Sequence, residues 1–173
     1  MFVRPVFLVV LFWILSVPVR AFIRRIRFAG NIAELPKDDP GMAMAQADAR
    51  ATLPEFLRRL ETPGVDLPSA AVKVPLTVPG GIEHVWINGI RIEGNEFVGR
   101  VDNQPHRTSG VKAGDTIRVR QAEISDWKLV ENGQLVGGYT IRYLMKRMPA
   151  RQRKAMLAGL PFTIGAEPIP RAA

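Results

Sequence analysis

Between residues 70 and 144 apolar and polar side chains alternate in short runs, which is the pattern of half-buried strands. Val72, Val74, Leu76 and Val78 form the first such run. Pro75 lies inside it and predicts an edge strand, because proline donates no backbone hydrogen bond. Further alternating runs lie within 83–92, 96–102, 116–120 and 127–144. About six short strands separated by turns predict a small antiparallel β-barrel or a strongly bent sheet.

Two turn signals organise these strands. Asn132-Gly133 stands between two apolar runs and predicts a tight hairpin. Its return strand is expected to carry Tyr139 and Thr140. Asn88-Gly89 interrupts the second run and indicates either a β-bulge or a tight turn. The pair Gly137-Gly138 either bends the return strand or lets another backbone approach closely.

Helical periodicity replaces the alternation on both sides of the strands. Asp39 followed by Pro40 predicts the start of one helix. The capping-box pattern Thr52–Glu55 predicts a second helix from Leu53, with an apolar stripe that packs on the sheet. A basic C-terminal helix is expected over 142–159, interrupted and restarted at Pro149. The fold class is therefore α+β, with an N-terminal helical pair, and residues 161–173 are expected to form a disordered tail.

The N-terminus is dominated by an uninterrupted apolar run from Pro5 to Val19. This length is typical of the hydrophobic part of a signal peptide, and Arg20 near its end allows a membrane span of about 20 residues by snorkelling. Four arginines follow the run and one precedes it, which favours a retained anchor with the remaining chain in the cytoplasm. An exported, periplasmic domain is the alternative. The predicted division is anchor or signal 1–29, linker 30–41 and one domain over 42–160.

The net charge of +8 lies mainly at the two ends of the chain. Residues 31–141 hold 12 basic and 15 acidic residues, which gives that part a net charge of −3. A nucleic-acid-binding protein is expected to carry its positive charge on the folded face that docks, so nucleic acid is excluded as a partner. Charge beside an apolar segment instead favours an anionic lipid surface. The residues expected to contact it are Arg20, Arg24, Arg25, Arg27, Lys146, Arg147, Arg151, Arg153 and Lys154. The alternative for the C-terminal helix is a solvated helix whose methionines pack on the sheet.

The residue inventory restricts the chemistry. Cysteine is absent, which excludes disulfides, thiol nucleophiles and thiolate zinc sites. The two histidines, His84 and His106, lie too far apart in sequence for a short metal-binding motif. We therefore expect no metal site and no cofactor.

One corner of the predicted sheet gathers residues suited to recognition. The candidates for a ligand or partner site are His84, Trp86, Asn103, Asp126, Trp127, Tyr139 and Thr140. Tryptophan and tyrosine offer large contact areas with a polar group at one end. The alternative is a purely structural corner, in which Asp126 caps a turn and Trp127 fills the core. A hydrolase that uses Asp126 to orient His84 towards Thr140 or Ser125 is a third possibility, although no Gly-x-Ser-x-Gly motif supports it.

Several sequence blocks in order resemble a bacterial family known as domain of unknown function 2314, which contains YegJ-like proteins. The blocks are "DDPGMAMAQADARATLPEFL", "VKVPL" with "GGIEHVWI", "DNQP", "GVKAGD", "ISDW" and "GGYTIR". The resemblance runs from about Asp38 to Leu160 and does not include the predicted anchor. It implies no particular activity, ligand or cofactor. The expected function is non-enzymatic binding or scaffolding at the inner membrane with an unidentified protein partner; the alternatives are an exported binding domain and the hydrolase.

Overall fold

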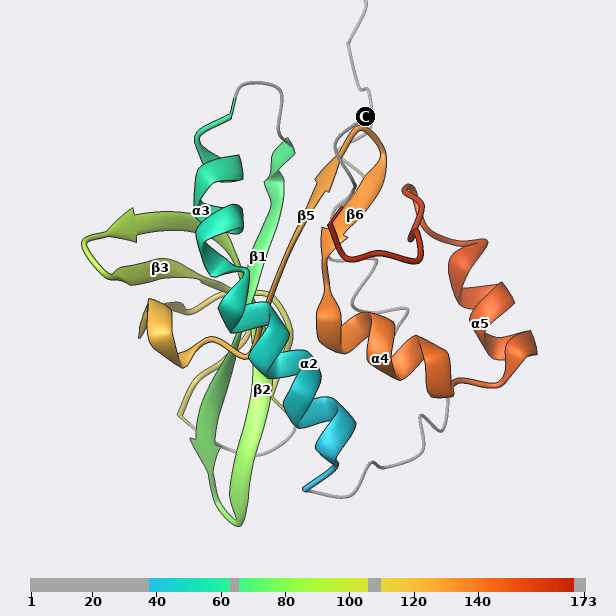
Figure 1. The fold of residues 1–173 in the computed structure, drawn as a ribbon. Coiled ribbons are helices and arrows are strands. Elements are labelled where there is room, and N and C mark those ends of the chain that lie inside the picture. The colour runs from blue at the N-terminus through green and yellow to red at the C-terminus, as the bar shows by residue number, and fades with distance from the viewer. Residues whose placement is uncertain (1–37, 63–65, 106–109, 170–173) are drawn as a thin grey trace, which may run out of the picture.

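A computed structural model describes residues 38–62, 66–105 and 110–169 of the chain. Two helices come first, α2 (Pro40–Ala51) and α3 (Leu53–Leu60). The strands are β1 (Asp66–Val78), β2 (Gly81–Glu93), β3 (Glu96–Val101), β4 (Thr116–Arg120), β5 (Asp126–Glu131) and β6 (Gln134–Gly137), with a short 3-10 helix, η1 (Gln121–Glu123), between β4 and β5. The helices α4 (Tyr139–Arg147) and α5 (Ala150–Leu157) follow the strands (Figure 1). The predicted anchor or signal segment, including its arginines, lies outside the described residues.

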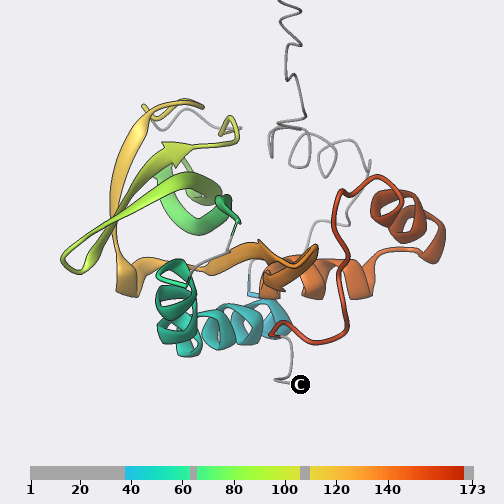
Figure 2. The same cartoon turned by 90° about the horizontal axis from the view of Figure 1, so that it is seen from above.

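The six strands form one antiparallel sheet in the order β4-β3-β2-β1-β5-β6. The sheet is strongly bent, and β1 to β4 curl over β5, α2 and α3 when seen from above (Figure 2). Register shifts interrupt the pairing of β1 with β5 and of β2 with β3, and Gly89 in the second of them has φ +60°. Such bulges bend a sheet, so of the two alternatives predicted at Asn88-Gly89 the structure has the bulge and not the tight turn. The α+β class is confirmed by the order of helices and strands.

The sheet does not close into a barrel, so that part of the prediction is wrong. The edge of β6 is instead paired with the C-terminal segment: the Leu135 amide donates to the Thr163 carbonyl, and the Thr163 amide donates to the Gly133 carbonyl, both at 2.8 Å. Residues 161–169 therefore do not form the disordered tail that their composition predicts. Backbone pairing satisfies their polar groups and covers an edge that would otherwise be open.

Pro75 lies in an internal strand rather than in an edge strand. β1 is placed between β2 and β5, but its pairing with β5 ends at Lys73, opposite Asp126. Beyond that point β1 pairs only with β2, and Pro75 is placed opposite His84. The proline therefore occupies a locally open edge, where its missing N–H group breaks no ladder on the β5 side.

The predicted starts of α2 and α3 are confirmed, whereas the capping box at Thr52 is wrong. Asp39 Oδ1 accepts a 2.8 Å hydrogen bond from the Met42 amide and caps α2. Thr52 makes no such cap for α3; its hydroxyl donates to the Asp48 carbonyl at 2.9 Å. Thr52 Oγ1 also accepts a hydrogen bond from the Trp127 indole N–H, so this side chain ties the junction of α2 and α3 to β5.

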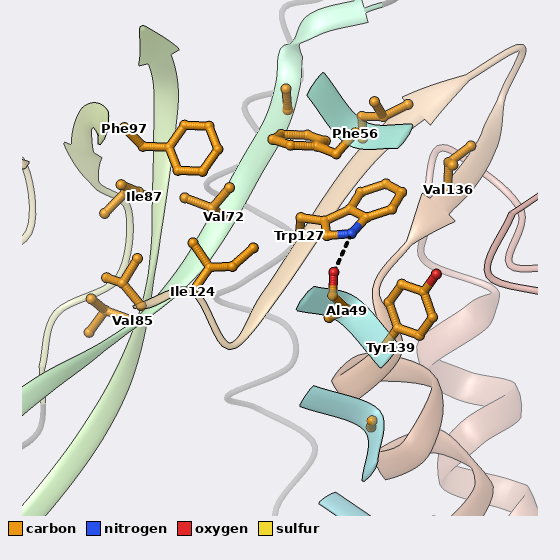
Figure 3. Close-up of a cluster of buried hydrophobic side chains, with 14 of the residues drawn as sticks. Ala49, Phe56, Val72, Val85, Ile87, Phe97, Ile124, Trp127, Val136 and Tyr139 are labelled. Carbon is orange, nitrogen blue, oxygen red and sulfur yellow. Dashed lines mark hydrogen bonds between the residues drawn. The ribbon is translucent and has the colours of Figure 1, made fainter. Parts of the chain in front are cut away.

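The main core lies between the sheet and the helices α2 and α3. Trp127 is fully buried at its centre, with ring centroids 5.1 Å from Phe56 and 6.0 Å from Tyr139 (Figure 3). The Trp127 indole nitrogen donates to the Ala49 carbonyl at 3.0 Å. The stripe predicted on α3 packs here: Phe56 is buried, and Leu53, Leu57 and Leu60 pack against the cluster.

The hairpin between β5 and β6 has the predicted turn at Asn132-Gly133, where both residues have positive φ values of 49° and 71°. Its return strand is shorter than the sequence predicts. β6 ends at Gly137, Gly138 continues in the left-handed region at φ +67°, and Tyr139 begins α4. Tyr139 and Thr140 therefore lie in the first turn of a helix and not on a strand. The glycine pair turns the chain out of the sheet.

Candidate functional site

The face of the sheet opposite the main core carries a row of polar and aromatic side chains. Lys73 on β1 is paired with Trp86 on β2 and with Asp126 on β5. Directly opposed residues share a face, so these three side chains follow one another across the sheet. We call this surface the Trp86 face; it comprises Lys73, His84, Trp86, Asn88, Asp126 and Lys128.

Two lysines lie over the ring of Trp86. Lys128 Nζ is 5.2 Å and Lys73 Nζ is 5.9 Å from the ring centroid, within the range of cation–π attraction. Trp86 is 7% exposed and Lys128 is 4% exposed. An apolar cluster from α4, α5 and residues 160–164 packs against Ala71 and Trp86 and shields this region from solvent.

Asp126 is the buried anchor of the Trp86 face. Its Oδ1 accepts hydrogen bonds from the backbone amides of Trp127 (2.8 Å) and Tyr139 (3.1 Å). Its Oδ2 accepts from the Thr140 amide (2.8 Å) and the Thr140 hydroxyl (2.6 Å). The carboxylate thus satisfies the first N–H groups of α4, where the helix dipole also favours negative charge.

Thr140 connects this anchor to the lysines. Its hydroxyl accepts a 3.3 Å hydrogen bond from Lys73 Nζ while donating to Asp126. Burial lowers the pKa of Lys73 and raises the pKa of Asp126, and the attraction between the two charges opposes both shifts. Burial also lowers the pKa of Lys128 to about 8, against the opposing effect of Asp102 and Asp126. The Trp86 face therefore holds amines that are weakly solvated and surrounded by aromatic and apolar groups.

His84 contacts Ser125 at the other end of the row, with 2.8 Å between Nδ1 and Oγ. Ser125 Oγ donates to the Lys73 carbonyl at 3.2 Å, so His84 Nδ1 carries the proton of the His84–Ser125 bond. That tautomer cannot accept the serine proton through Nδ1. The four hydrogen bonds given above for Asp126 come from residues 127, 139 and 140. Asp126 thus fixes α4 instead of orienting His84, and the geometry is not that of a hydrolase triad.

His84 gives the domain a specific pH response. Burial, and then the charge of Lys73, lower its pKa from 6.5 to about 4. The unfolded chain therefore binds a proton between pH 6.5 and pH 4 that the folded chain excludes, and stability falls as the pH drops through this window. His84→Gln removes this proton uptake. Between pH 6.5 and pH 4 the free energy of unfolding of the variant should therefore fall by about 1–3 kcal/mol less than that of the unmodified chain. Urea unfolding at pH 6.5 and pH 4 measures the difference; parallel losses in both proteins would contradict it.

Asn88 on the Trp86 face and Asn103 beside it hold β2 in position. Asn103 Oδ1 accepts a 2.8 Å hydrogen bond from the Trp86 amide, and the Asp102 amide donates to the Trp86 carbonyl, also at 2.8 Å. Asn88 Nδ2 donates to Asp102 Oδ1 at 3.0 Å. Asn88, Asp102 and Asn103 are all half-buried, so they fix the position of β2 and also reach the surface.

The structure thus brings together five of the seven predicted recognition residues: His84, Trp86, Asn103, Asp126 and Thr140. Trp127 and Tyr139 lie on the opposite side, in the main core, because the β-strand alternation places Trp127 away from its neighbours Asp126 and Lys128. Lys73 and Lys128 were not predicted, and Ser125 was named only in the hydrolase alternative. The same alternation places Lys73 and Lys128 on one face, but it does not indicate that helices cover that face.

The C-terminal basic residues divide into two groups. Lys146, Arg147, Arg151 and Lys154 are exposed, whereas Arg153 is half-buried. Met145 and Met148 are buried, and Met156 and Leu157 pack against the cluster over Trp86. The apolar side of α4 and α5 therefore packs on the domain, as in the solvated-helix alternative. The break at Pro149 is confirmed, and the first of the two helices begins at Tyr139 rather than at residue 142.

Residues 38–62, 66–105 and 110–169 contain neither a membrane-spanning helix nor a metal-binding cluster of side chains. No helix in these ranges is long and apolar enough to cross a bilayer. No group of three or more histidine, aspartate or glutamate side chains there is arranged to hold a metal ion.

Fold and site together define a small α+β domain with a bent antiparallel sheet, an aromatic core on one face and a lysine-flanked tryptophan on the other. The chain belongs to the family described as uncharacterised protein conserved in bacteria, domain of unknown function 2314, whose model matches residues 39–162. This confirms the resemblance found in the sequence.

Two relatives extend the comparison. The chain is 28% identical over 123 residues to the uncharacterised protein YegJ of Escherichia coli K12, covering 71% of this chain and 79% of that protein. It is 35% identical over 88 residues to a putative ankyrin repeat protein of Neisseria meningitidis serogroup B, covering 49% of this chain and 35% of that protein. No solved structure matches the chain.

Proposed function

We propose that this protein is a non-enzymatic binding module that works at the inner membrane, with its domain facing the cytoplasm and the Trp86 face as its recognition surface. One observation carries the proposal: two poorly solvated lysine amines lie over a single tryptophan ring. Lys73, His84 and Asn88 are half-buried on the same face, so a partner reaches the row at these three residues, while Trp86 and Lys128 are buried behind them.

A protein segment that carries a carboxylate fits this surface. A carboxylate placed beside Lys73 gains more than it would in water, because Lys73 is already largely removed from solvent and the buried Lys128 adds positive charge behind it. Trp86 supplies apolar contact area beside them. The match to a putative ankyrin repeat protein supports a protein partner, since repeats of that type form extended binding surfaces.

The location in this proposal is supported by the sequence of the N-terminus. The apolar run from Pro5 to Val19 is followed by four arginines, and such residues stay on the cytoplasmic side. A reporter fused after Ala173 tests the orientation. Green fluorescence without alkaline phosphatase activity is the expected result; phosphatase activity would instead favour the exported, periplasmic alternative.

Site-specific photo-cross-linking in cells tests the recognition surface. Arg100 is exposed and is paired with Asn88, so a photo-reactive residue there lies beside the Trp86 face. Glu61 is exposed at the end of α3, on the side of the main core, and serves as the control position. We expect a discrete protein adduct from position 100 and not from position 61. Lys73→Gln should reduce the adduct several-fold, and because Lys73 also contacts Thr140 and faces Asp126, a urea titration of the variant checks that the domain remains folded.

The cross-linking result separates this proposal from nonspecific contact. Identical adducts from both positions, or an adduct at position 100 that Lys73→Gln leaves unchanged, would reject the Trp86 face as the binding surface. An adduct that depends on Lys73 and appears only from position 100 identifies the partner directly by mass spectrometry.

A further inference from the structure

A second concave site is lined by residues of α4, by Arg153 of α5 and by residues 164–166 of the segment that returns along β6. It is a cleft of about 150 Å³. One wall carries three basic side chains, Arg142, Lys146 and Arg153, together with Met145. The other wall is made by residues 164–166.

Arg142 is 7% exposed and holds the base of this cleft. Its Nε donates to the Gly137 carbonyl at 2.8 Å, one terminal nitrogen donates to the Leu135 carbonyl at 2.7 Å, and the other donates to the Gly165 carbonyl. A guanidinium group has five N–H donors, so these three bonds leave two. The three acceptors are neutral carbonyls, which orient the group without neutralising its charge.

Nothing acidic belongs to the cleft wall. None of the described residues that line it is acidic. The sequence explains this, because residues 139–166 contain six basic residues and no acidic one. Arg147 is paired with Asp39 across the α2–α4 contact at 3.2 Å, but it does not line the cleft. The cleft therefore brings three positive charges together in a mainly apolar concavity, and at Arg142 the nearby Asp126 and Glu167 offset part of that charge. In such a partly desolvated concavity an anion is bound more strongly than on an open surface.

We propose that this cleft binds a phosphate group, carried by either a small phosphate ester or a lipid headgroup. A tetrahedral anion bound there is reached by Lys146 and Arg153 from the rim and attracted by the fixed Arg142 at the base. Met145 and Ile164 provide apolar contact for the group that carries the phosphate. Met145 and Ile164 also belong to the cluster that packs on Trp86, but none of the three basic residues lies on the Trp86 face, so the two proposals are tested separately.

Calorimetric titration of the full-length chain in nonionic detergent, at constant ionic strength, tests this site with two probes. One probe is inorganic phosphate, and the other is a soluble short-chain phosphatidic acid. Lys146→Gln/Arg153→Gln removes two cleft cations, while Arg151→Gln/Lys154→Gln removes the same charge from α5 outside the cleft. We expect the cleft variant to bind at least one of the probes about tenfold more weakly, and the control variant to stay within about twofold of the unmodified chain.

The pattern of results assigns the source of the phosphate. Cleft-dependent binding of inorganic phosphate supports a soluble phosphate ligand, and cleft-dependent binding of the lipid alone supports a headgroup. Equal weakening by both double variants would show diffuse charge attraction and overturn the site, as would the absence of binding for both probes. Cross-linking from position 100 is unaffected by these variants, so failure here is distinguishable from failure of the proposed function.

Discussion

Replacing Asp126 with alanine is expected to lower the free energy of unfolding by about 3–5 kcal/mol, because buried donors without acceptors cost about 1–3 kcal/mol each. The carboxylate accepts three backbone amide bonds and one hydroxyl bond, and the side chain is fully buried. Its loss leaves the start of α4 without acceptors. It also removes the negative charge that faces Lys73. Urea unfolding followed by tryptophan fluorescence measures the effect.

Asp115→Ala is the matched control. Asp115 is exposed in a turn, where its Oδ2 accepts one hydrogen bond from the Lys112 amide at 2.7 Å. Its replacement should cost no more than about 1 kcal/mol. Asp126→Asn should fall between the two, because the amide retains one oxygen acceptor but presents an N–H group to the other donors. Equal losses for Asp126→Ala and Asp115→Ala would refute the anchoring role of Asp126.

Gly137→Ala is expected to destabilise the domain by about 3–5 kcal/mol, combining the left-handed backbone penalty with overpacking. Gly137 has φ +70°, and a Cβ atom there would lie 2.6 Å from Trp127 Cε3 and in contact with the Trp127 carbonyl. Trp127 is fully buried in the main core and has no room to withdraw. The free energy of unfolding, again from urea titration, is the measured quantity.

Gly133→Ala separates the two causes. Gly133 has a nearly identical φ of +71°, but nothing lies within 4 Å of an added Cβ atom. Only the backbone penalty of about 1–2 kcal/mol applies at that position. If both alanine variants lose the same stability, the close approach to Trp127 contributes nothing and the packing argument fails.

Local rules made much of the fold predictable. Asp39-Pro40 specifies a helix start and Asn132-Gly133 specifies a hairpin, because each depends on the conformations open to two or three adjacent residues. The six alternating runs gave the number of strands, because alternation depends only on the side chains within each run. That the sheet stays open was not predictable, because it depends on which segment pairs with β6. That segment, around Thr163, lies about thirty residues further along the chain.

The candidate site shows the same division. Strand alternation around Asp126 already places its side chain and that of Trp127 on opposite faces of the sheet. The sequence does not reveal that Trp86 contacts Lys73 and Lys128, because these residues lie far apart along the chain. Lys73, Trp86 and Asp126 become neighbours only through the pairing of β1 with both β2 and β5. The early end of β6 at Gly137 likewise depends on contact with Trp127, which no local signal carries.

The sequence by itself determined the α+β class, the starts of α2 and α3, the hairpin, the family and the concentration of positive charge near the C-terminus, because each follows from local conformational preference or from composition. The tertiary structure alone decided that the sheet stays open, that α4 and α5 cover the Trp86 face, and that Arg142 lies buried at the base of a basic cleft. These features arise from contacts between distant segments, whose free energies depend on register and burial rather than on neighbouring residues.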